Sequence, residues 1–210
     1  MTARDLLAAL FEADRKLREA EATLLADGDA DALTRAFGAA VDQALALDDQ
    51  DEAAARLTRL ADLCAQVQGQ RNAETLLRIL NHASPEVRLA AGEALRDFAY
   101  DRYAEVARAI EKATDAGLGA PALQEVPWIL AEVGEPSAVP LIARCLKNPD
   151  PEVVASAIEA LAELGDQSAV ALLAPLARDK RIVQLEEGDA GYTTTLGQLA
   201  EEAITELEGG

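Results

Sequence analysis

Apolar residues recur every three or four positions through the second half of the chain, the spacing that places side chains on one face of an α-helix. One such stripe contains Val139, Ile142 and Leu146. A second stripe follows a short polar turn, with the members Val153, Ala157, Ala160, Leu161 and Leu164. The pattern predicts two short helices joined by a tight turn.

This helix pair repeats along the chain. The segment EPSAVPLI at 135–142 returns 31 positions later as DQSAVALL, and DPEV at 150–153 matches SPEV 66 positions earlier. The 66-residue shift also places Leu161 on Leu95. Two ungapped offsets that preserve apolar positions indicate internal repeats, and repeats of this length are typical of stacked helical arrays.

The predicted helices begin and end at residues that commonly cap helices. Asp150 precedes Pro151: its carboxylate is suited to accept hydrogen bonds from the first free N–H groups, and proline fits the first helical position. Gly165 supplies the left-handed residue that commonly ends a helix. Thr195 and Gln198 have the spacing of a capping box for the last helix.

A DPEV-type turn, a second helix closing on EALAELG and a period near 31 residues resemble HEAT-like repeats, in particular the short bacterial repeats also found in phycobilisome lyases. The resemblance covers residues 70–208 and implies an all-α fold, a right-handed α-solenoid of stacked antiparallel helix pairs. It also implies a binding scaffold. The departures are an irregular loop at 115–121, Pro127 inside a second helix, and about twelve extra residues before the final helix.

The first 70 residues are also helical in pattern but less regular, with three apolar stripes. We divide the chain into an N-terminal helical cap at 1–47 and a HEAT-like repeat array at 48–210, since solenoids require covers for their exposed ends. Leu10, Leu17 and Leu24 stand seven residues apart, but a run this short does not establish a coiled coil.

Composition and charge limit the partners. Aromatic residues make up only 3% of the chain, which disfavours a β-sandwich. Thirty-eight acidic and nineteen basic side chains give a net charge of −19. Such a field repels phosphate backbones and anionic lipids, so we expect no nucleic-acid and no membrane partner. The sequence predicts neither a spanning segment nor a secretory signal, and the expected location is the cytoplasm.

Residue types suited to catalysis or metal binding are sparse. The single histidine, His82, argues against two-histidine zinc sites, di-iron sites and histidine-based triads. No glycine motif for phosphate binding occurs. Cys64 and Cys145 lie within apolar helical patterns, so we expect free, buried thiols. We expect a non-enzyme, with no catalytic residue, no cofactor and no metal.

Carboxylates are abundant, and the repeats order one set of them. Four second helices carry residues at i, i+4 in equivalent positions, which places both members of each pair on one helix face. The set consists of Glu93 and Asp97, Trp128 and Glu132, Glu159 and Glu163, and Glu202 and Glu206. In a HEAT-like stack the second helices line the concave side, so the resemblance implies an acidic ladder there. The pairs have two interpretations: solvated positions common in such repeats, or a surface that binds a basic partner.

Trp128 and Tyr192 are the aromatic candidates for partner binding. We expect Pro127 to kink or delay its helix and to turn the neighbouring Trp128 toward the core. The alternative is an exposed indole in an acidic groove, which would be a binding anchor. Tyr192 lies in the second of two β-favouring runs, 182–185 and 192–195, which predict a short hairpin. This hairpin either shields the end of the stack or recognises a partner.

Three functions are compatible with these patterns. The first is a non-catalytic scaffold whose acidic concave surface binds a basic or amphipathic segment of another protein. The second, implied by the narrower resemblance, is a bilin-lyase-type enzyme or accessory factor, which the low aromatic content and the lack of clustered nucleophiles disfavour. The third is a structural or oligomerisation module acting through the N-terminal helices. The sequence predicts no particular oligomeric state.

Overall fold

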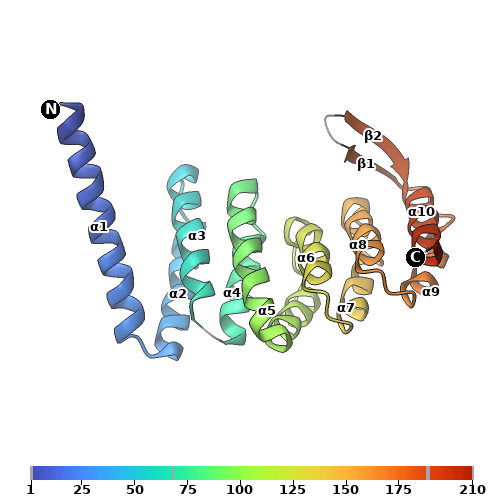
Figure 1. Ribbon diagram of the computed structural model, residues 1–210, viewed down its shortest axis with the longest axis horizontal. Helices are drawn as coiled ribbons and strands as arrows, with labels where there is room; N and C mark the ends of the chain where they lie inside the picture. The colour runs from blue at the N-terminus through green and yellow to red at the C-terminus, as the bar shows by residue number, and fades with distance from the viewer. Residues whose placement is uncertain (1, 68, 188–189, 210) are drawn as a thin grey trace.

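The computed structural model of this chain describes residues 2–67, 69–187 and 190–209. It is an elongated row of helices that ends in a two-stranded hairpin and a final helix (Figure 1). The elements in chain order are α1 (Ala3–Asp27), α2 (Ala30–Leu45), α3 (Gln50–Ala65), α4 (Gln70–Leu80), α5 (Pro85–Asp115), α6 (Ala120–Val133), α7 (Ala138–Cys145), α8 (Pro151–Leu164), α9 (Ala169–Leu173), the short 3₁₀ turn η1 (Ala174–Leu176), β1 (Ile182–Glu187), β2 (Ala190–Thr195) and α10 (Leu196–Gly209). The predicted helical repeat array is confirmed.

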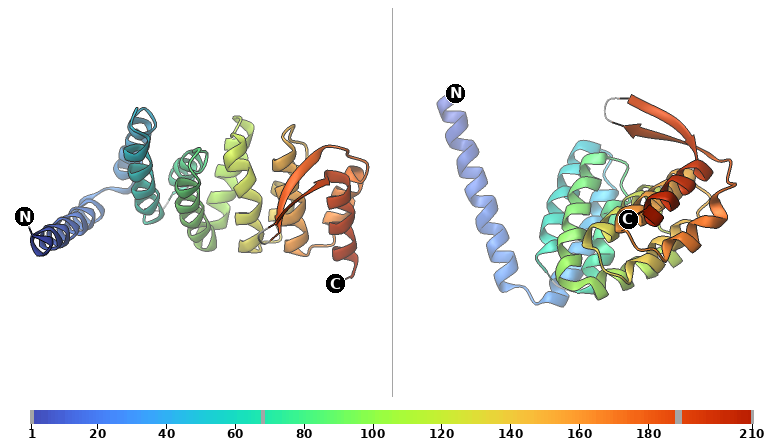
Figure 2. Two further views of the ribbon diagram at one scale, coloured as in Figure 1. Left: turned by 90° about the horizontal axis from the view of Figure 1, so that it is seen from above. Right: turned by 45° about the vertical axis from the view of Figure 1, so that its right-hand side comes forward.

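The helices stack in two layers (Figures 1 and 2). The second helices α3, α5, α6, α8 and α10 pack against one another in that order and form one layer. The first helices α2, α4, α7 and α9 lie behind their partners. Each helix contacts mainly its neighbours in the row, which is the quasi-one-dimensional packing of a repeat protein.

α5 belongs to two helix pairs at once. Its backbone leaves helical geometry at Arg102, where φ is −145° and ψ is 48°. Residues 85–101 therefore form the second helix of one pair, and residues 103–115 form the first helix of the next, without a loop between them. The irregular loop predicted by the sequence follows α5, before α6 begins at Ala120.

One continuous core fills the space between the layers. Leu95, Leu130 and Leu161, which come from three successive second helices, have no exposed surface. These side chains belong to the apolar stripes that repeat along the sequence, so the helical spacing identified the core face correctly. Cys64 and Cys145 are buried in the same core as free thiols, as predicted.

The predicted cap chemistry is present. The Asp150 carboxylate accepts a hydrogen bond of 3.0 Å from the backbone N–H of Glu152, at the start of α8. Gly165 ends α8 in the left-handed conformation, with φ of 69°. The Thr195 hydroxyl accepts a hydrogen bond from the Gln198 N–H, and Gln198 Oε1 accepts one from the Thr195 N–H, both at 3.2 Å. This reciprocal pair is the expected capping box of α10.

The insertion before the last helix is the predicted hairpin. β1 and β2 are antiparallel, with Ile182 opposite Thr195 and Leu185 opposite Tyr192. Residues 188–189 lie outside the described part of the chain. β1 contacts α8 and β2 contacts α10, so the hairpin is packed at its base while its far end projects from the row (Figure 1).

The two N-terminal helices differ in their packing. α2 packs against α3 and α4 and buries Leu33, Phe37 and Val41. α1 leans away from the row, and its contacts with it lie near its C-terminal end (Figures 1 and 2). There, Leu25 packs against the core, and Glu21 forms an ion pair of 3.1 Å with Arg59 of α3.

α1 therefore does not cover the end of the stack, although the sequence led us to expect a covering helix. The reason is a mismatch of surfaces: α1 carries an apolar face, whereas the outer side of α3 presents exposed Glu52, Arg56 and Arg59. The division of the chain at 47/48 stays a prediction.

Candidate functional site

The candidate site is the solvent-facing side of the second-helix layer. α5, α6, α8 and α10 are consecutive neighbours in this layer, so the structure brings their i, i+4 pairs onto adjacent helices. Six of the seven predicted acidic residues are exposed there: Glu93, Asp97, Glu132, Glu163, Glu202 and Glu206. Glu159 is half-buried.

Between α5 and α6 the acidic face is partly neutralised by arginines. Arg96 Nη1 lies 2.8 Å from Glu132 Oε2, and Arg88 Nε lies 3.2 Å from Glu125 Oε1. The hydrogen bond to Glu132 raises the pKa of Arg96, and the nearby carboxylates of Glu93 and Asp97 act in the same direction. Sequence reasoning missed these ion pairs, although the repeat offset places Arg96 beside Glu132.

On α8 and α10 the acidic face has no basic side chain within either helix. Residues 150–210 contain thirteen acidic and three basic side chains, which gives them −10 of the total charge of −19. Within the described part of the chain, no ion pair involves the acidic set of these two helices: Glu159, Glu163, Glu202 and Glu206. The uncompensated charge is thus concentrated at the C-terminal half of the layer.

Glu159 has the most perturbed environment in this set. Burial raises the pKa of its carboxyl group, and the negative charge of Glu152 raises it further. Both effects disfavour the ionised form, because a half-buried carboxylate loses solvation without gaining a cation. A cationic group placed beside Glu159 would reverse this balance, which makes the residue a candidate contact.

Trp128 is 41% exposed, so the expectation that it packs in the core is wrong. α6 runs unbroken from Ala120 to Val133 with Pro127 inside it. Because the helix is neither ended nor delayed, Trp128 keeps the register of the equivalent Glu159 and faces solvent.

A second aromatic residue lies on the same face and was missed by sequence reasoning. Tyr100 of α5 is exposed, and its hydroxyl donates a hydrogen bond of 3.2 Å to the carbonyl oxygen of Glu132 in α6. Leu89, also on α5, is exposed as well. The face therefore combines acidic side chains with apolar contact points at Leu89, Tyr100 and Trp128. The sequence signal for the two missed residues, Leu89 and Tyr100, was their helical spacing from Glu93 and Asp97.

Tyr192 does not join the acidic set. It lies on β2, opposite Leu185, in the hairpin that projects beyond the ends of α8 and α10 (Figure 1). Its side chain is 42% exposed. The predicted binding residues thus fall into two places: the second-helix face and the hairpin.

Other parts of the molecule offer little for chemistry. Over the described residues, no group of three or more His, Cys, Asp or Glu side chains is arranged to hold a metal ion. A hollow of about 410 Å³ lies at the other layer, between α4 and the end of α5. Its two cations, Arg78 and Lys112, already pair with Asp42 and Glu74. No helix in the described ranges is both long and apolar enough to span a bilayer.

The comparisons with known proteins agree with this geometry. Residues 120–186 match the family model described as HEAT repeats. A search of curated proteins found no match. The chain is similar, at 20% identity and a TM-score of 0.55, to a solved structure from work on the structural basis of microtubule plus end tracking by XMAP215, CLIP-170 and EB1, over 91% of this chain and 81% of that chain.

Two crystal structures of engineered proteins also align with the chain. Their identities are 20% and 22%, with TM-scores of 0.38 and 0.40. The alignments cover 91% and 93% of this chain, and 90% and 93% of the engineered chains. At such identities, the likeness to the first solved structure supports the helical-repeat fold.

Proposed function

We propose that this HEAT-repeat chain is a non-catalytic scaffold that binds a basic or amphipathic segment of another protein on its second-helix face. HEAT repeats generally mediate protein–protein interactions, because a stacked helical surface is long and can be varied residue by residue. The finer proposal rests on one observation: exposed Trp128 stands next to α8, whose carboxylates form no ion pair with any described residue.

The two parts of this surface would act differently. The carboxylates of α8 and α10 attract cations over a distance of several ångströms and raise the rate of encounter with a basic segment. An indole acts only in contact, where it buries a large apolar area and excludes water from neighbouring charges. An amphipathic segment with basic and apolar residues on one side satisfies both requirements.

Glu159 is a second reason to expect a basic side chain of the partner close to Trp128. Its half-buried carboxylate is poorly solvated, so a Lys or Arg at this position would gain a charge-assisted hydrogen bond at low desolvation cost to the protein. Trp128 occupies the equivalent position on α6, and its ring can stack on the apolar stem of the same cation.

The test uses Trp128 as its own reporter, since it is the only tryptophan in the chain. The probe is a synthetic amphipathic helix rich in Lys and Leu, compared with a peptide of equal length in which Glu replaces Lys. We expect the basic probe to shift the Trp128 emission and the acidic probe to leave it unchanged. Glu159→Gln with Glu163→Gln should weaken the response several-fold.

A matched control separates this site from the general negative charge. Glu12→Gln with Glu19→Gln removes the same two charges from α1, far along the row from α8 (Figure 1). The control variant should bind the basic probe like the parent. Equal weakening in the two double variants would show that the peptide follows net charge rather than this face, and the proposal would be wrong.

A further inference from the structure

α1 presents a long apolar face that nothing in the described chain covers. Among the described residues, it carries six of the thirteen large apolar side chains that are exposed, including Leu10 at 61% and Phe11 at 65%. Four of the six, Leu6, Leu10, Leu17 and Leu24, lie at a and d positions of a heptad frame, whereas Leu7 and Phe11 lie outside these positions. Every a and d position of this frame is apolar over three successive heptads. The seam consists of Ala3, Leu6, Leu10, Ala13, Leu17, Ala20 and Leu24.

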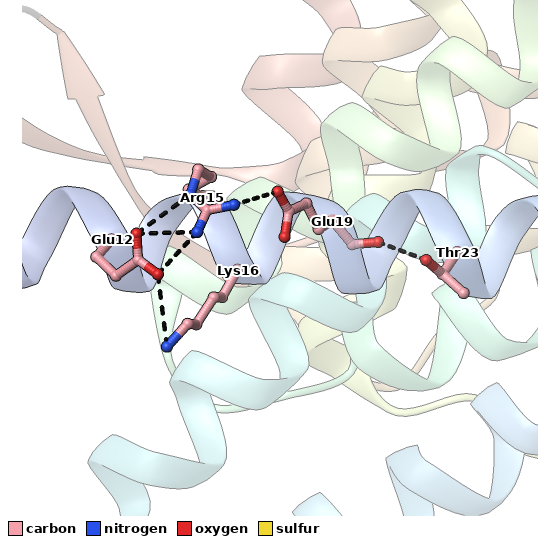
Figure 3. A network of polar contacts seen from close by, with 5 residues as sticks. All are labelled: Glu12, Arg15, Lys16, Glu19 and Thr23. Atoms are coloured by element: carbon pink, nitrogen blue, oxygen red, sulfur yellow. Dashed lines mark hydrogen bonds and ion pairs between the residues drawn. The ribbon is translucent and has the colours of Figure 1, made fainter.

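The opposite face of α1 satisfies its own polar groups. Arg15 forms ion pairs with Glu12 at 2.8 Å and with Glu19 at 2.5 Å, and the Thr23 hydroxyl donates to the carbonyl oxygen of Glu19 (Figure 3). The first turn is closed by a capping box between Thr2 and Asp5. α1 is therefore specified locally as a helix, and its seam is left without a partner.

The charge of α1 argues against a lipid surface as the cover. Helices that lie on anionic membranes are rich in Lys and Arg on their polar face. α1 has four basic and six acidic residues. The outer side of α3 does not cover the seam either, because its exposed Glu52 and Arg56 are charged.

We propose that the seam of α1 is covered by α1 of a second copy of this chain, in a parallel two-stranded coiled coil. Seven successive a and d positions of Leu and Ala form a self-complementary surface of the kind that coiled coils bury. The alanine layers let the two backbones approach closely, and the leucine layers supply most of the buried area.

Charges beside the seam select the parallel orientation. In a parallel pair, the g residue of one helix faces the e residue five positions later on the other, which brings Lys16 toward Glu21 of the second copy. In an antiparallel pair with full overlap, g faces g and e faces e. That arrangement brings Lys16 toward Lys16 and Asp14 toward Asp14, and like charges at these positions are unfavourable.

The first test is sedimentation equilibrium of the full chain over a wide dilution series, at a physiological salt concentration that screens the repulsion between two acidic chains. We expect a reversible monomer–dimer equilibrium. Leu10→Gln with Leu17→Gln should raise the dissociation constant more than about tenfold, since four buried leucines are lost per dimer. The control Arg15→Gln with Glu19→Gln changes two outer-face residues to the same residue and leaves Lys16 and its ion-pair partner Glu12 in place, so it should dimerise like the parent.

The second test keeps every leucine and therefore holds even if the seam variant unravels α1. Lys16→Glu and Glu21→Lys each replace attraction by repulsion, so each variant alone should dimerise several-fold more weakly than the parent. Mixed together, the two variants restore opposite charges at both contacts between positions 16 and 21 across the seam. Native mass spectrometry, with one variant labelled with ¹⁵N, should show mixed dimers above the statistical proportion.

The mixing experiment also controls for the loss of the ion pair that Glu21 forms with Arg59 of its own chain. Glu21→Lys removes this pair both alone and in the mixture, so its loss cannot produce a preference for mixed dimers. A matched exchange at outward-facing positions, Arg15→Glu mixed with Glu19→Arg, should give the statistical proportion.

Three results would overturn the proposal or its orientation. A parent chain that is monomeric at every concentration would overturn the proposal, and so would dimerisation that is unaffected by the leucine changes. If Lys16→Glu and Glu21→Lys give only the statistical proportion of mixed dimers, the parallel register is wrong.

Discussion

Arg181 Nη1 donates a hydrogen bond of 2.9 Å to the carbonyl oxygen of Asn148. Asn148 lies in the turn between α7 and α8, and Arg181 directly precedes β1, so this bond joins the base of the hairpin to the preceding helix pair. Asp179 holds the guanidinium in place: its Oδ2 lies 2.7 Å from Arg181 Nη2, and its Oδ1 accepts the Arg181 backbone N–H at 2.9 Å.

This arrangement predicts a stability contribution that depends on pH. Hydrogen bonds from Arg181 lower the pKa of Asp179, so the folded protein binds this proton less tightly than the unfolded chain. The contribution is fully present above the unfolded pKa of about 3.9 and is lost as the pH falls through the lower folded value. Asp179→Asn should therefore reduce the free energy of unfolding at neutral pH and have little effect in strong acid.

Urea unfolding of the parent and the variant, from neutral pH to strong acid, measures the difference in their free energies of unfolding. Asp97→Asn, which removes an exposed carboxylate of α5, serves as the control and should show a smaller change at neutral pH. If Asp179→Asn lowers the free energy of unfolding by the same amount from neutral to strongly acid pH, the stabilisation does not depend on the ionisation of Asp179.

The position of the core is tested by two leucines on second helices. Leu161 is fully buried, and Leu161→Ala should lower the free energy of unfolding by about 2–5 kcal/mol through lost burial and a residual cavity. Leu89 is exposed, and Leu89→Ala should cost less than about 0.5 kcal/mol. Chemical unfolding followed by circular dichroism gives both values. A Leu161→Ala cost as small as that of Leu89→Ala would show that the core is misplaced.

Two buried cysteines report on the integrity of the stack. Burial raises the pKa of Cys64 to about 12 and that of Cys145 to about 11. The thiolate is the form that reacts, so both residues should be nearly inert to a thiol reagent in the folded protein at mildly alkaline pH. Both should react once the chain is unfolded in urea. A thiol that reacts rapidly without denaturant would contradict the packing around it.

The features predicted from the sequence are those determined by neighbouring residues. The hairpin, the Asp150 cap and the capping box at Thr195 each depend on chemistry within a few positions, and the structure confirms them. Trp128 was misplaced because proline was expected to disturb α6. The helix continues through Pro127, so the repeat register was the better guide.

The features that were missed depend on which helices lie side by side. The ion pair between Arg96 and Glu132 crosses from α5 to α6 and joins residues 36 positions apart. The apolar stripe of α1 indicates that this helix needs a cover, but a stripe does not identify the surface that supplies it. The junction at Arg102 joins two helix pairs where no glycine or proline marks an end.

The last prediction separates the two ways in which the second-helix face would hold a partner. Long-range attraction to carboxylates mainly sets the association rate and weakens with salt, since the screening length is about 8 Å near physiological ionic strength. A packed indole acts only after contact, so it controls the dissociation rate and depends less on salt. Glu159→Gln with Glu163→Gln and Trp128→Ala should therefore change different rate constants.

With a partner segment in hand, surface-based kinetic binding at several salt concentrations gives both rates. The double neutralisation should slow association and flatten its salt dependence, while Trp128→Ala should accelerate dissociation at every salt concentration. Glu12→Gln with Glu19→Gln, which removes two charges from α1, should leave both rates close to those of the parent. If the double neutralisation and Trp128→Ala also bind like the parent throughout, the acidic face is merely solvated. Binding would then have to be sought at the projecting hairpin, where Tyr192 is the exposed aromatic residue.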